Sequence, residues 1–538
     1  MEWWKEAVFY QIYPRSFKDS NADGVGDLNG IKEKLDYFNW LGIDALWICS
    51  FFKSPMVDFG YDISDYNAID PIFGDIEDFK DLLENAHKKH IRIVIDQVYN
   101  HTSDQHPWFI ESRSSRNNPK SDWYIWKDPK PGGTPPTNWV SLFSGEKEES
   151  AWAWDENRKQ YYLHLFAKEQ PDLNWQNENV RKTVYDSIRF WLDLGVDGFR
   201  FDAASHFYKD LERDLIKGPQ IKKSLFESSR DNYYWDPFTA RPETLIEIEK
   251  IRKFMDSYQD RASIGEISSD MGLCLYLMFT IPGRFNIAFN IDFLEKLSFN
   301  ASNLRNLAST LDYFFGSRAW PSYVTGNHDN RRILSRMTDG MNVGIEDKKK
   351  ISKLFATMLL TLRGTPFLYY GEEIGMEDTY IPHDKIMDPW GKSLWPKPGR
   401  DPSRTPMQWD SSKYAGFSNV EPWLPVNENK SKTNVDEEMK DPDSILNFYK
   451  KLIHERKTHE PLRSGTMQFL NIDDDILAYK RESNYAMTVI LNFSDKIKVL
   501  DENLKGQIII SNYSRTGNRG EQFEIRPFES MIIKNDHR

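Results

Sequence analysis

Runs of apolar residues alternate, along most of the chain, with segments in which apolar residues recur every three or four positions. Apolar runs between polar turns predict buried strands, and the wider spacing predicts amphipathic helices. Such an alternation is typical of βα units around a parallel sheet. Eight strands are expected, at residues 7–13, 45–50, 91–97, 198–203, 262–267, 285–292, 322–326 and 366–370. They predict an α/β protein with a closed (β/α)8 TIM barrel.

Two of the intervening helices have recognisable ends. Asp75 is placed to cap a helix over residues 75–89. Gly195 is placed to end a helix through residues 184–192, directly before the fourth strand.

Two stretches interrupt the alternation. Residues 104–172 are rich in Trp, Pro, Asn and charge without a clear period, which predicts a small domain inserted after the third strand. From residue 464 to 538, short alternating strands separated by Asn, Asp and Gly predict a C-terminal antiparallel β-sandwich. The barrel then comprises residues 1–103 and 173–463, with a long loop at 372–442 that is expected to overhang its mouth.

Charge and composition narrow the function classes. The 538 residues include 70 Lys and Arg against 82 Asp and Glu, a net charge of −12, which disfavours nucleic acids and anionic membranes as partners. No signal-peptide pattern or membrane-spanning run is visible, so we expect a cytoplasmic protein. We also expect a monomer or a weak homo-oligomer. Cys49 and Cys274 are too few for a disulfide framework and are expected to be buried thiols.

Titratable residues gather where the predicted strands end. His101 follows the third strand, Asp202 ends the fourth, Glu266 lies in the fifth, and His328 and Asp329 follow the seventh. A parallel barrel brings these strand ends to one face. A single carboxylate there more often belongs to a structural ion pair, but three carboxylates in one pocket indicate catalysis.

Paired carboxylates suit glycoside hydrolysis, which needs one ionised group and one that delivers a proton. Arg200 lies two residues from Asp202 on the same strand face and favours its ionised form, so Asp202 is the candidate nucleophile. Glu266 has no cation beside it in the sequence and is the candidate acid. Asp329 is a third, ionised carboxylate that can bind sugar hydroxyls.

Four segments, DQVYNH, GFRFDAASH, GEIS and GNHDN, together resemble the α-amylase superfamily of retaining glycosidases, in its α-glucosidase branch. QPDLN and SRTPMQWD are similar to further segments of the oligo-1,6-glucosidase-like members, and the resemblance covers essentially the whole chain. It implies that Asp202 is the nucleophile, Glu266 the general acid and base, and Asp329 the transition-state stabiliser.

The same resemblance implies a set of residues that hold the sugar. An Asp62–Arg400 pair would close the far end of the pocket and make the enzyme exo-acting. Ala203, after the nucleophile, favours α-1,4 or sucrose-type substrates over α-1,6 linkages, and His206 resembles an endo-amylase histidine that contacts the leaving sugar. The implied sugar-binding residues are Tyr61, Asp62, His101, Phe166, Arg200, Ala203, His206, His328 and Arg400.

The segment DSNADGVGD offers oxygen ligands at alternate positions, as calcium loops do. We expect a structural Ca²⁺ here and no organic cofactor, although a polar Asp-Gly turn is the simpler reading. The expected ligands are Asp19, Asn21, Asp23, the backbone carbonyl of Val25, and Asp27.

Three functions remain open from the sequence. The first is an exo-acting retaining α-glucosidase that releases α-glucose from short oligosaccharides or disaccharides. The second is a glucosyl transferase or isomerase that passes the same covalent intermediate to a sugar, although no Arg-Leu-Asp-Arg signature of isomerases is visible. The third, a non-catalytic binding subunit, is disfavoured because the carboxylates are intact.

Overall fold

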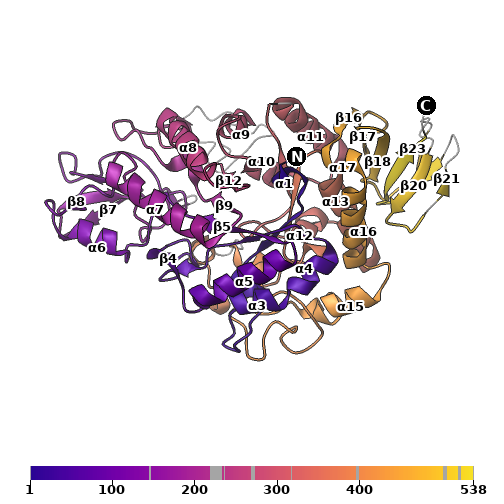
Figure 1. Cartoon of the computed structure of the whole chain (residues 1–538), viewed down its shortest axis with the longest axis horizontal. Helices are drawn as coiled ribbons and strands as arrows, with labels where there is room; N and C mark the ends of the chain where they lie inside the picture. The colour runs from indigo at the N-terminus through magenta and orange to yellow at the C-terminus, as the bar shows by residue number, and fades with distance from the viewer. Residues whose placement is uncertain are drawn as a thin grey trace.

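An eight-stranded parallel sheet forms the centre of the computed structural model, which describes residues 2–144, 147–217, 233–235, 237–267, 273–316, 318–394, 399–500, 506–515, 517–518 and 523–536 (Figure 1). The strand order is β13-β12-β9-β5-β2-β1-β15-β14. At the edge where the sheet closes, the Ser322 hydroxyl donates to the Ala288 carbonyl over 2.7 Å. The strands are β1 (Phe9–Ile12), β2 (Ala45–Ile48), β5 (Arg92–Gln97), β9 (Gly198–Phe201), β12 (Ala262–Glu266), β13 (Ile287–Phe289), β14 (Ser322–Val324) and β15 (Thr365–Tyr369).

All eight expected strands are present, so the predicted TIM barrel is confirmed. The sixth strand is shorter than expected, because Asn290 starts a helix, α10 (Ile291–Lys296), inside the range that the sequence assigned to the strand. The Asn290 side chain accepts the backbone N–H of Phe293, which satisfies a donor that the first turn leaves open.

The two predicted helix ends are also confirmed. Asp75 caps α5 (Ile76–Lys88) in a reciprocal arrangement with Asp78, and α7 (Glu178–Leu194) ends at Gly195 with φ of 105°. The other helices outside the insertion are α1 (Trp3–Glu6), α2 (Pro14–Phe17), α3 (Leu28–Glu33), α4 (Leu35–Leu41), α8 (Pro242–Met255), α9 (Leu273–Thr280), α11 (Ala301–Phe315), α12 (Ile333–Thr338), α13 (Ile345–Thr361), α14 (Pro389–Leu394), α15 (Val435–Lys440), α16 (Ile445–Thr458) and α17 (Glu460–Ser464).

The segment between β5 and α7 forms a separate layer at one end of the molecule (Figure 1). It contains α6 (Pro107–Ser114) and a three-stranded antiparallel sheet, in the order β6 (Trp126–Lys127), β8 (Gln160–Leu163) and β7 (Trp152–Asp155). Its hydrophobic cluster, which includes Trp139 and Leu165, is distinct from the barrel core. Two further strand pairs are antiparallel: β3 (Phe52–Lys53) with β4 (Asp65–Ile69), and β10 (Ile216–Lys217) with β11 (Tyr233–Trp235).

The C-terminal part forms an antiparallel sheet at the opposite end of the molecule, as the sequence predicted (Figure 1). It packs on α13, where the Thr357 hydroxyl donates to the Ser530 hydroxyl over 2.9 Å. The strand order is β16 (Thr466–Leu470), β17 (Ile476–Glu482), β18 (Ala486–Asn492), β23 (Ser530–Asn535), β20 (Gly506–Ser511) and β21 (Gly517–Asn518), and β19 (Lys498–Leu500) pairs with β22 (Phe523–Ile525).

The two cysteines differ in environment. Cys49 is buried as expected, but Cys274 is exposed, so that prediction is wrong for Cys274. The reason is its position on α9, which buries Leu275, Tyr276 and Phe279 and leaves the Cys274 side in solvent. Among the helices that the structure describes, none is long and apolar enough to cross a bilayer.

Candidate active site

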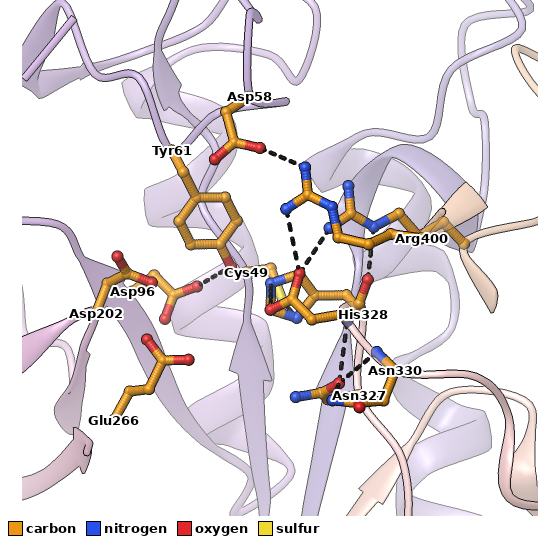
Figure 2. A network of polar contacts seen from close by, with 12 residues as sticks. Cys49, Asp58, Tyr61, Asp96, Asp202, Glu266, Asn327, His328, Asn330 and Arg400 are labelled. Carbon is orange, nitrogen blue, oxygen red and sulfur yellow. Dashed lines mark hydrogen bonds and ion pairs between the residues drawn. The ribbon is translucent and has the colours of Figure 1, made fainter. Parts of the chain in front are cut away.

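Asp202, Glu266 and Asp329 lie around one cavity of about 180 Å³ at the carboxyl ends of the barrel strands. Figure 2 shows Asp202 and Glu266 on one side of this site, with Arg400 and Asp58 across from them. The convergence expected from the strand ends is therefore present in the fold. The cavity is lined by Asp58, Tyr61, His101, Phe143, Phe166, Gln170, Asp202, Glu266, His328, Asp329, Trp390 and Arg400.

Arg200 connects the two candidate catalytic carboxylates. Its buried guanidinium places Nη1 at 2.7 Å from Asp202 Oδ1 and Nη2 at 2.9 Å from Glu266 Oε1. Nη1 also contacts Asp96 over 3.2 Å. The sequence associated Arg200 with Asp202 alone, because the proximity of β12 to β9 is a property of the fold. One cation is therefore shared among carboxylates of three neighbouring strands.

The residue after Asp202 also contacts the candidate acid. The backbone N–H of Ala203 donates to Glu266 Oε2 over 3.0 Å. Ala203 has a φ of 44°, in the left-handed region that non-glycine residues rarely adopt. Strained backbone of this kind is common at functional sites, and here it aims the amide at the carboxylate.

Burial raises the pKa of both carboxylates, and Glu266 keeps the higher value. Burial raises the pKa of Glu266 to about 7, against the opposing charge of Arg200 and with a further increase from Asp202. Burial also raises the pKa of Asp202, to about 6, and the attraction of Arg200 offsets only part of it. Near neutral pH, Asp202 is mainly ionised while Glu266 retains a substantial protonated fraction. The difference agrees with the roles expected from the sequence, although Arg200 contacts both groups.

Asp329 has the opposite electrostatic character. Burial opposes its ionisation, but His328, Arg404 and Arg400 outweigh it and hold the pKa of Asp329 well below its usual range. Asp329 Oδ1 lies 2.8 Å from Arg404 Nη2 and 3.3 Å from Arg400 Nη1. Arg404 Nε also donates to the His328 carbonyl over 2.6 Å. Asp329 is thus a fixed negative charge in the cavity wall.

The two histidines of the cavity are neutral. Burial lowers the pKa of His328 to about 3 and also lowers the pKa of His101. The His328 ring stacks on Tyr61, with ring centroids 5.3 Å apart, and the Tyr61 hydroxyl donates to Asp96 Oδ2 over 2.6 Å. Neutral imidazoles can donate to sugar hydroxyls without adding positive charge.

Arg400 pairs with Asp58 over 2.7 Å and with Asp388 over 2.8 Å, and the expected Asp62–Arg400 pair is wrong. The Asp62 carboxylate is buried and accepts hydrogen bonds from the Ser54 hydroxyl and the backbone N–H of Asp58. Asp62 therefore folds the turn that presents Asp58 to the cavity. The spacing of acidic residues in VDFGYD did not reveal which of them turns inward.

Two aromatic residues that the sequence did not single out complete the wall beside Arg400. Phe143 of the inserted segment and Trp390 of α14 stack with centroids 6.0 Å apart and ring planes 13° apart. The Arg400 guanidinium lies 5.4 Å from the Phe143 ring, and Phe143 meets the expected residue Phe166 edge-on at 5.4 Å. Phe143 lies in an irregular loop and Trp390 in the short helix α14 of the long segment after β15, so no periodic signal identified the pair.

Gln170 was visible in the sequence only as part of the QPDLN segment. It also lines the cavity, where its Nε2 donates to Asp58 Oδ2 over 3.2 Å. Three of the expected sugar-binding residues do not line the cavity and are buried behind the residues that do: Arg200, Ala203 and His206. The buried His206 ring packs 6.3 Å from Phe166, with Nδ1 at 3.2 Å from the Phe238 carbonyl.

The segment proposed for calcium forms a compact loop before α3. Its donor set contains oxygen only, which is the ligand chemistry that Ca²⁺ prefers. The Asp19 carboxylate accepts the backbone N–H groups of Ala22 and Gly24, and Asp27 accepts that of Gly30 at the start of α3. Among the described residues, no group of three or more His, Cys, Asp or Glu side chains is arranged to hold a metal ion. Calcium binding therefore stays a prediction.

A barrel with an inserted layer and three carboxylates around one cavity at its strand ends provides the groups that glycoside hydrolysis needs. Residues 11–465 match the family model described as the catalytic domain of alpha amylase. The chain belongs to this family.

Relatives with curated names span nearly the whole chain. A probable alpha-glucosidase of Rhizobium meliloti is 40% identical over 92% of this chain and 90% of its own length. An oligo-1,6-glucosidase of Heyndrickxia coagulans is 39% identical over 99% of both chains.

Solved structures are similarly close. The crystal structure of an alpha-glucosyl transfer enzyme aligns over 100% of both chains with a TM-score of 0.93 and 38% identity. A mutant isomaltulose synthase from Erwinia rhapontici, in complex with sucrose, aligns over 99% of both chains with a TM-score of 0.90 and 36% identity.

Proposed function

We propose that the protein is an exo-acting, retaining α-glucosidase that releases α-glucose from the non-reducing end of short α-glucosides. The observation that carries this proposal is that Asp202 and Glu266 both line one sugar-sized cavity and both contact the buried guanidinium of Arg200 behind it. Two carboxyl groups bound to one guanidinium favour the separation of about 5 to 5.5 Å that is typical of retaining enzymes.

The charge states assign the chemical steps. Ionised Asp202 attacks the anomeric carbon from the β face, while protonated Glu266 gives its proton to the departing glycosidic oxygen. The product of this step is a β-glucosyl ester of Asp202 and a free aglycone. Glu266, now ionised, then takes a proton from water as the water oxygen attacks the same carbon. Asp202 is released and the glucose keeps its α configuration.

The rest of the cavity positions the sugar and stabilises its charge. Asp329 stays ionised beside Arg404 and Arg400, so it can accept hydrogen bonds from sugar hydroxyls and offset the positive charge of the transition state. His101 and His328 supply neutral donors. The Asp58–Arg400 pair and the Phe143–Trp390 stack close the end of the cavity away from Glu266, which favours exo-action.

The proposal also includes the type of glycosidic linkage that the enzyme prefers. Ala203 favours α-1,4 or sucrose-type substrates, whereas several relatives are named oligo-1,6-glucosidases. One methylene more or less in a pocket discriminates between substrates by only about 1 to 3 kcal/mol, so Ala203 alone does not determine the linkage. A panel of maltose, isomaltose, sucrose, trehalose and p-nitrophenyl α-glucoside measures the preference directly. Turnover of isomaltose far above that of maltose and sucrose would contradict the proposed linkage.

A second candidate function is transfer of the glucosyl group to a sugar, giving a transglucosylation product or an isomer of sucrose. The similarity to the alpha-glucosyl transfer enzyme and to isomaltulose synthase favours it. Analysis of the products from sucrose distinguishes the two: equal glucose and fructose indicates hydrolysis, and a new disaccharide indicates transfer or isomerisation.

The proposed nucleophile has a direct test. A 5-fluoro-α-glucosyl fluoride forms a slowly hydrolysed ester, and mass spectrometry of the digested protein should find it on Asp202. The matched variant Asp202→Asn should carry no label and should lose at least about 10⁴-fold in kcat. A label on another residue, or full activity of the variant, would reject the mechanism.

A further inference from the structure

Lys209 is a fully buried lysine that the proposed chemistry does not use. Its Nζ contacts Asp172 Oδ1 over 2.7 Å and donates to Asn100 Oδ1 over 2.8 Å, and the side chains of Lys209 and Asp172 are both 0% exposed. Lys209 follows β9, Asn100 follows β5, and Asp172 lies where the inserted segment returns to the barrel. Three separate parts of the chain therefore meet at one cation, next to the cavity.

These contacts fix the orientation of the Asn100 amide. A lysine ammonium only donates, so the amide oxygen must face Lys209. An ionised carboxylate only accepts, and Asp172 Oδ1 lies 3.0 Å from Asn100 Nδ2. Both neighbours thus require the same orientation, and a flipped amide would lose both hydrogen bonds.

The fixed amide in turn determines the protonation of His101. Asn100 Nδ2 lies 3.2 Å from His101 Nδ1, so this ring nitrogen must accept and cannot carry a proton. In a neutral imidazole the proton then sits on Nε2. His101 Nε2 lies 3.1 Å from the Tyr61 carbonyl, which can only accept and therefore requires a proton on Nε2. Gln170 Nε2 also lies 3.2 Å from His101 Nε2, but its two protons go to Asp58 Oδ2 and to the Tyr61 carbonyl, so it does not need His101 as an acceptor.

We propose that Lys209 is a positioning residue that, through the side-chain amide of Asn100, holds His101 in the tautomer whose Nε2 carries the proton on the cavity side. In this tautomer the Nε2 proton is donated to the Tyr61 carbonyl at the cavity wall, where a sugar hydroxyl can share it as a second acceptor. The other tautomer would present a lone pair and would place two N–H donors against each other at Nδ1. The role in sugar binding rests on the proposed function, whereas the tautomer itself does not.

The tautomer can be measured without any substrate. Nitrogen chemical shifts of protein labelled with ¹⁵N-histidine distinguish the two neutral forms, and the variant His101→Gln identifies the signal of His101. We expect the Nε2–H form in the wild type. Asn100→Asp replaces the donor by an acceptor of nearly the same shape, so it should place a proton on Nδ1. An Nδ1–H form in the wild type would overturn the proposal.

Activity measurements test whether the network acts through His101. Lys209→Met and Asn100→Asp should each lower kcat/KM for p-nitrophenyl α-glucoside by about tenfold, mainly through KM, the size expected for a misdirected buried hydrogen bond. In a His101→Ala background, the same substitutions should change kcat/KM by less than about twofold. If Lys209→Met lowered kcat/KM by the same factor in the His101→Ala background as in the wild type, Lys209 would act independently of His101. This result would also overturn the proposal.

Controls separate this outcome from other failures. Lys353→Met removes another nearly buried lysine, whose Nζ donates to the Asp443 carbonyl away from the cavity, and it should leave kcat/KM unchanged. If Lys209→Met does not fold, the Asn100→Asp variant and the tautomer of the wild type still decide the question. If the wild type turns over no α-glucoside, the proposed function fails while the nitrogen shifts continue to test the tautomer.

Discussion

The backbone N–H of Ala203 donates to Glu266 Oε2, so the residue that follows the proposed nucleophile holds the proposed acid. Arg200 binds the other oxygen of the same carboxylate, Oε1, over 2.9 Å. Both oxygens of Glu266 thus have fixed partners before substrate binds. The acid is preorganised by neighbours of Asp202, and a change at either carboxylate is felt by the other.

The pH dependence of activity follows from this pair. Activity requires ionised Asp202, whose pKa is about 6, and protonated Glu266, whose pKa is about 7. We expect kcat/KM to fall on the acid side as the pair gains a proton and on the alkaline side as it loses one. The profile should be a narrow bell with its maximum between about pH 6 and 7. A plateau that extends above pH 9 would contradict the assignment of Glu266.

Glu266 should also lower the stability of the folded protein at alkaline pH. Its pKa is raised from 4.5 to about 7, so the folded state binds the proton more tightly than the unfolded state, and stability decreases as pH rises through this range. Glu266→Gln removes the penalty, and its free energy of unfolding at pH 8 should exceed that of the wild type by up to about 3 kcal/mol. Arg200 keeps Asp96 and Asp202 as partners in this variant.

Asp329→Asn is the matched variant for that experiment. The pKa of Asp329 is lowered on folding, so its ionised form contributes stability at neutral pH, and the variant should be less stable than the wild type at pH 8. Urea unfolding at pH 5 and pH 8 measures both effects. If both substitutions changed the free energy of unfolding at pH 8 by the same amount and in the same direction, the opposite pKa shifts of Glu266 and Asp329 would not control stability.

Asp58 and Asp62 should separate by phenotype. Asp58→Asn weakens the pairing with Arg400 in the cavity wall, so KM for maltose should rise about tenfold with a small change in melting temperature. Asp62→Asn disturbs the turn, where the carboxylate accepts from Ser54 and Asp58, and should lower the melting temperature by several degrees. Steady-state kinetics and thermal melts of both variants check this prediction. If Asp62→Asn raised KM and Asp58→Asn lowered the melting temperature instead, Asp62 would be the partner of Arg400.

Calcium removal tests the loop before α3. If Asp19, Asn21 and Asp23 bind Ca²⁺, chelation should lower the melting temperature and leave kcat nearly unchanged well below it, because the loop supplies no acid or base. Addition of Ca²⁺ but not Mg²⁺ should restore stability. Identical melting curves with chelator and with Ca²⁺ would leave the loop as a hydrogen-bonded turn without a metal role.

The sequence predicts the parts of the site that regular structure positions. Asp202, Glu266 and Asp329 lie at or just after strand ends, and a parallel barrel brings strand ends together whatever the loops do. The sequence did not distinguish Asp58 from Asp62, because the choice depends on which carboxylate caps a turn. Phe143 comes from a loop and Trp390 from the short helix α14; neither lies in a segment with a periodic pattern, and only the folded chain brings them together.

Arg200 contacts Asp96 beside it on β5, Asp202 at the end of its own strand and Glu266 on β12, three neighbours in the sheet order. The reactive charges are therefore built into the barrel wall, while Asp58, Phe143 and Trp390 belong to the segments that connect the barrel strands. The residues proposed to break the glycosidic bond thus lie at or just after the ends of the barrel strands, and those proposed to select the substrate belong to the segments between them. Natural or designed substitutions in these segments can therefore change the acceptor or the linkage while the catalytic carboxylates stay in place.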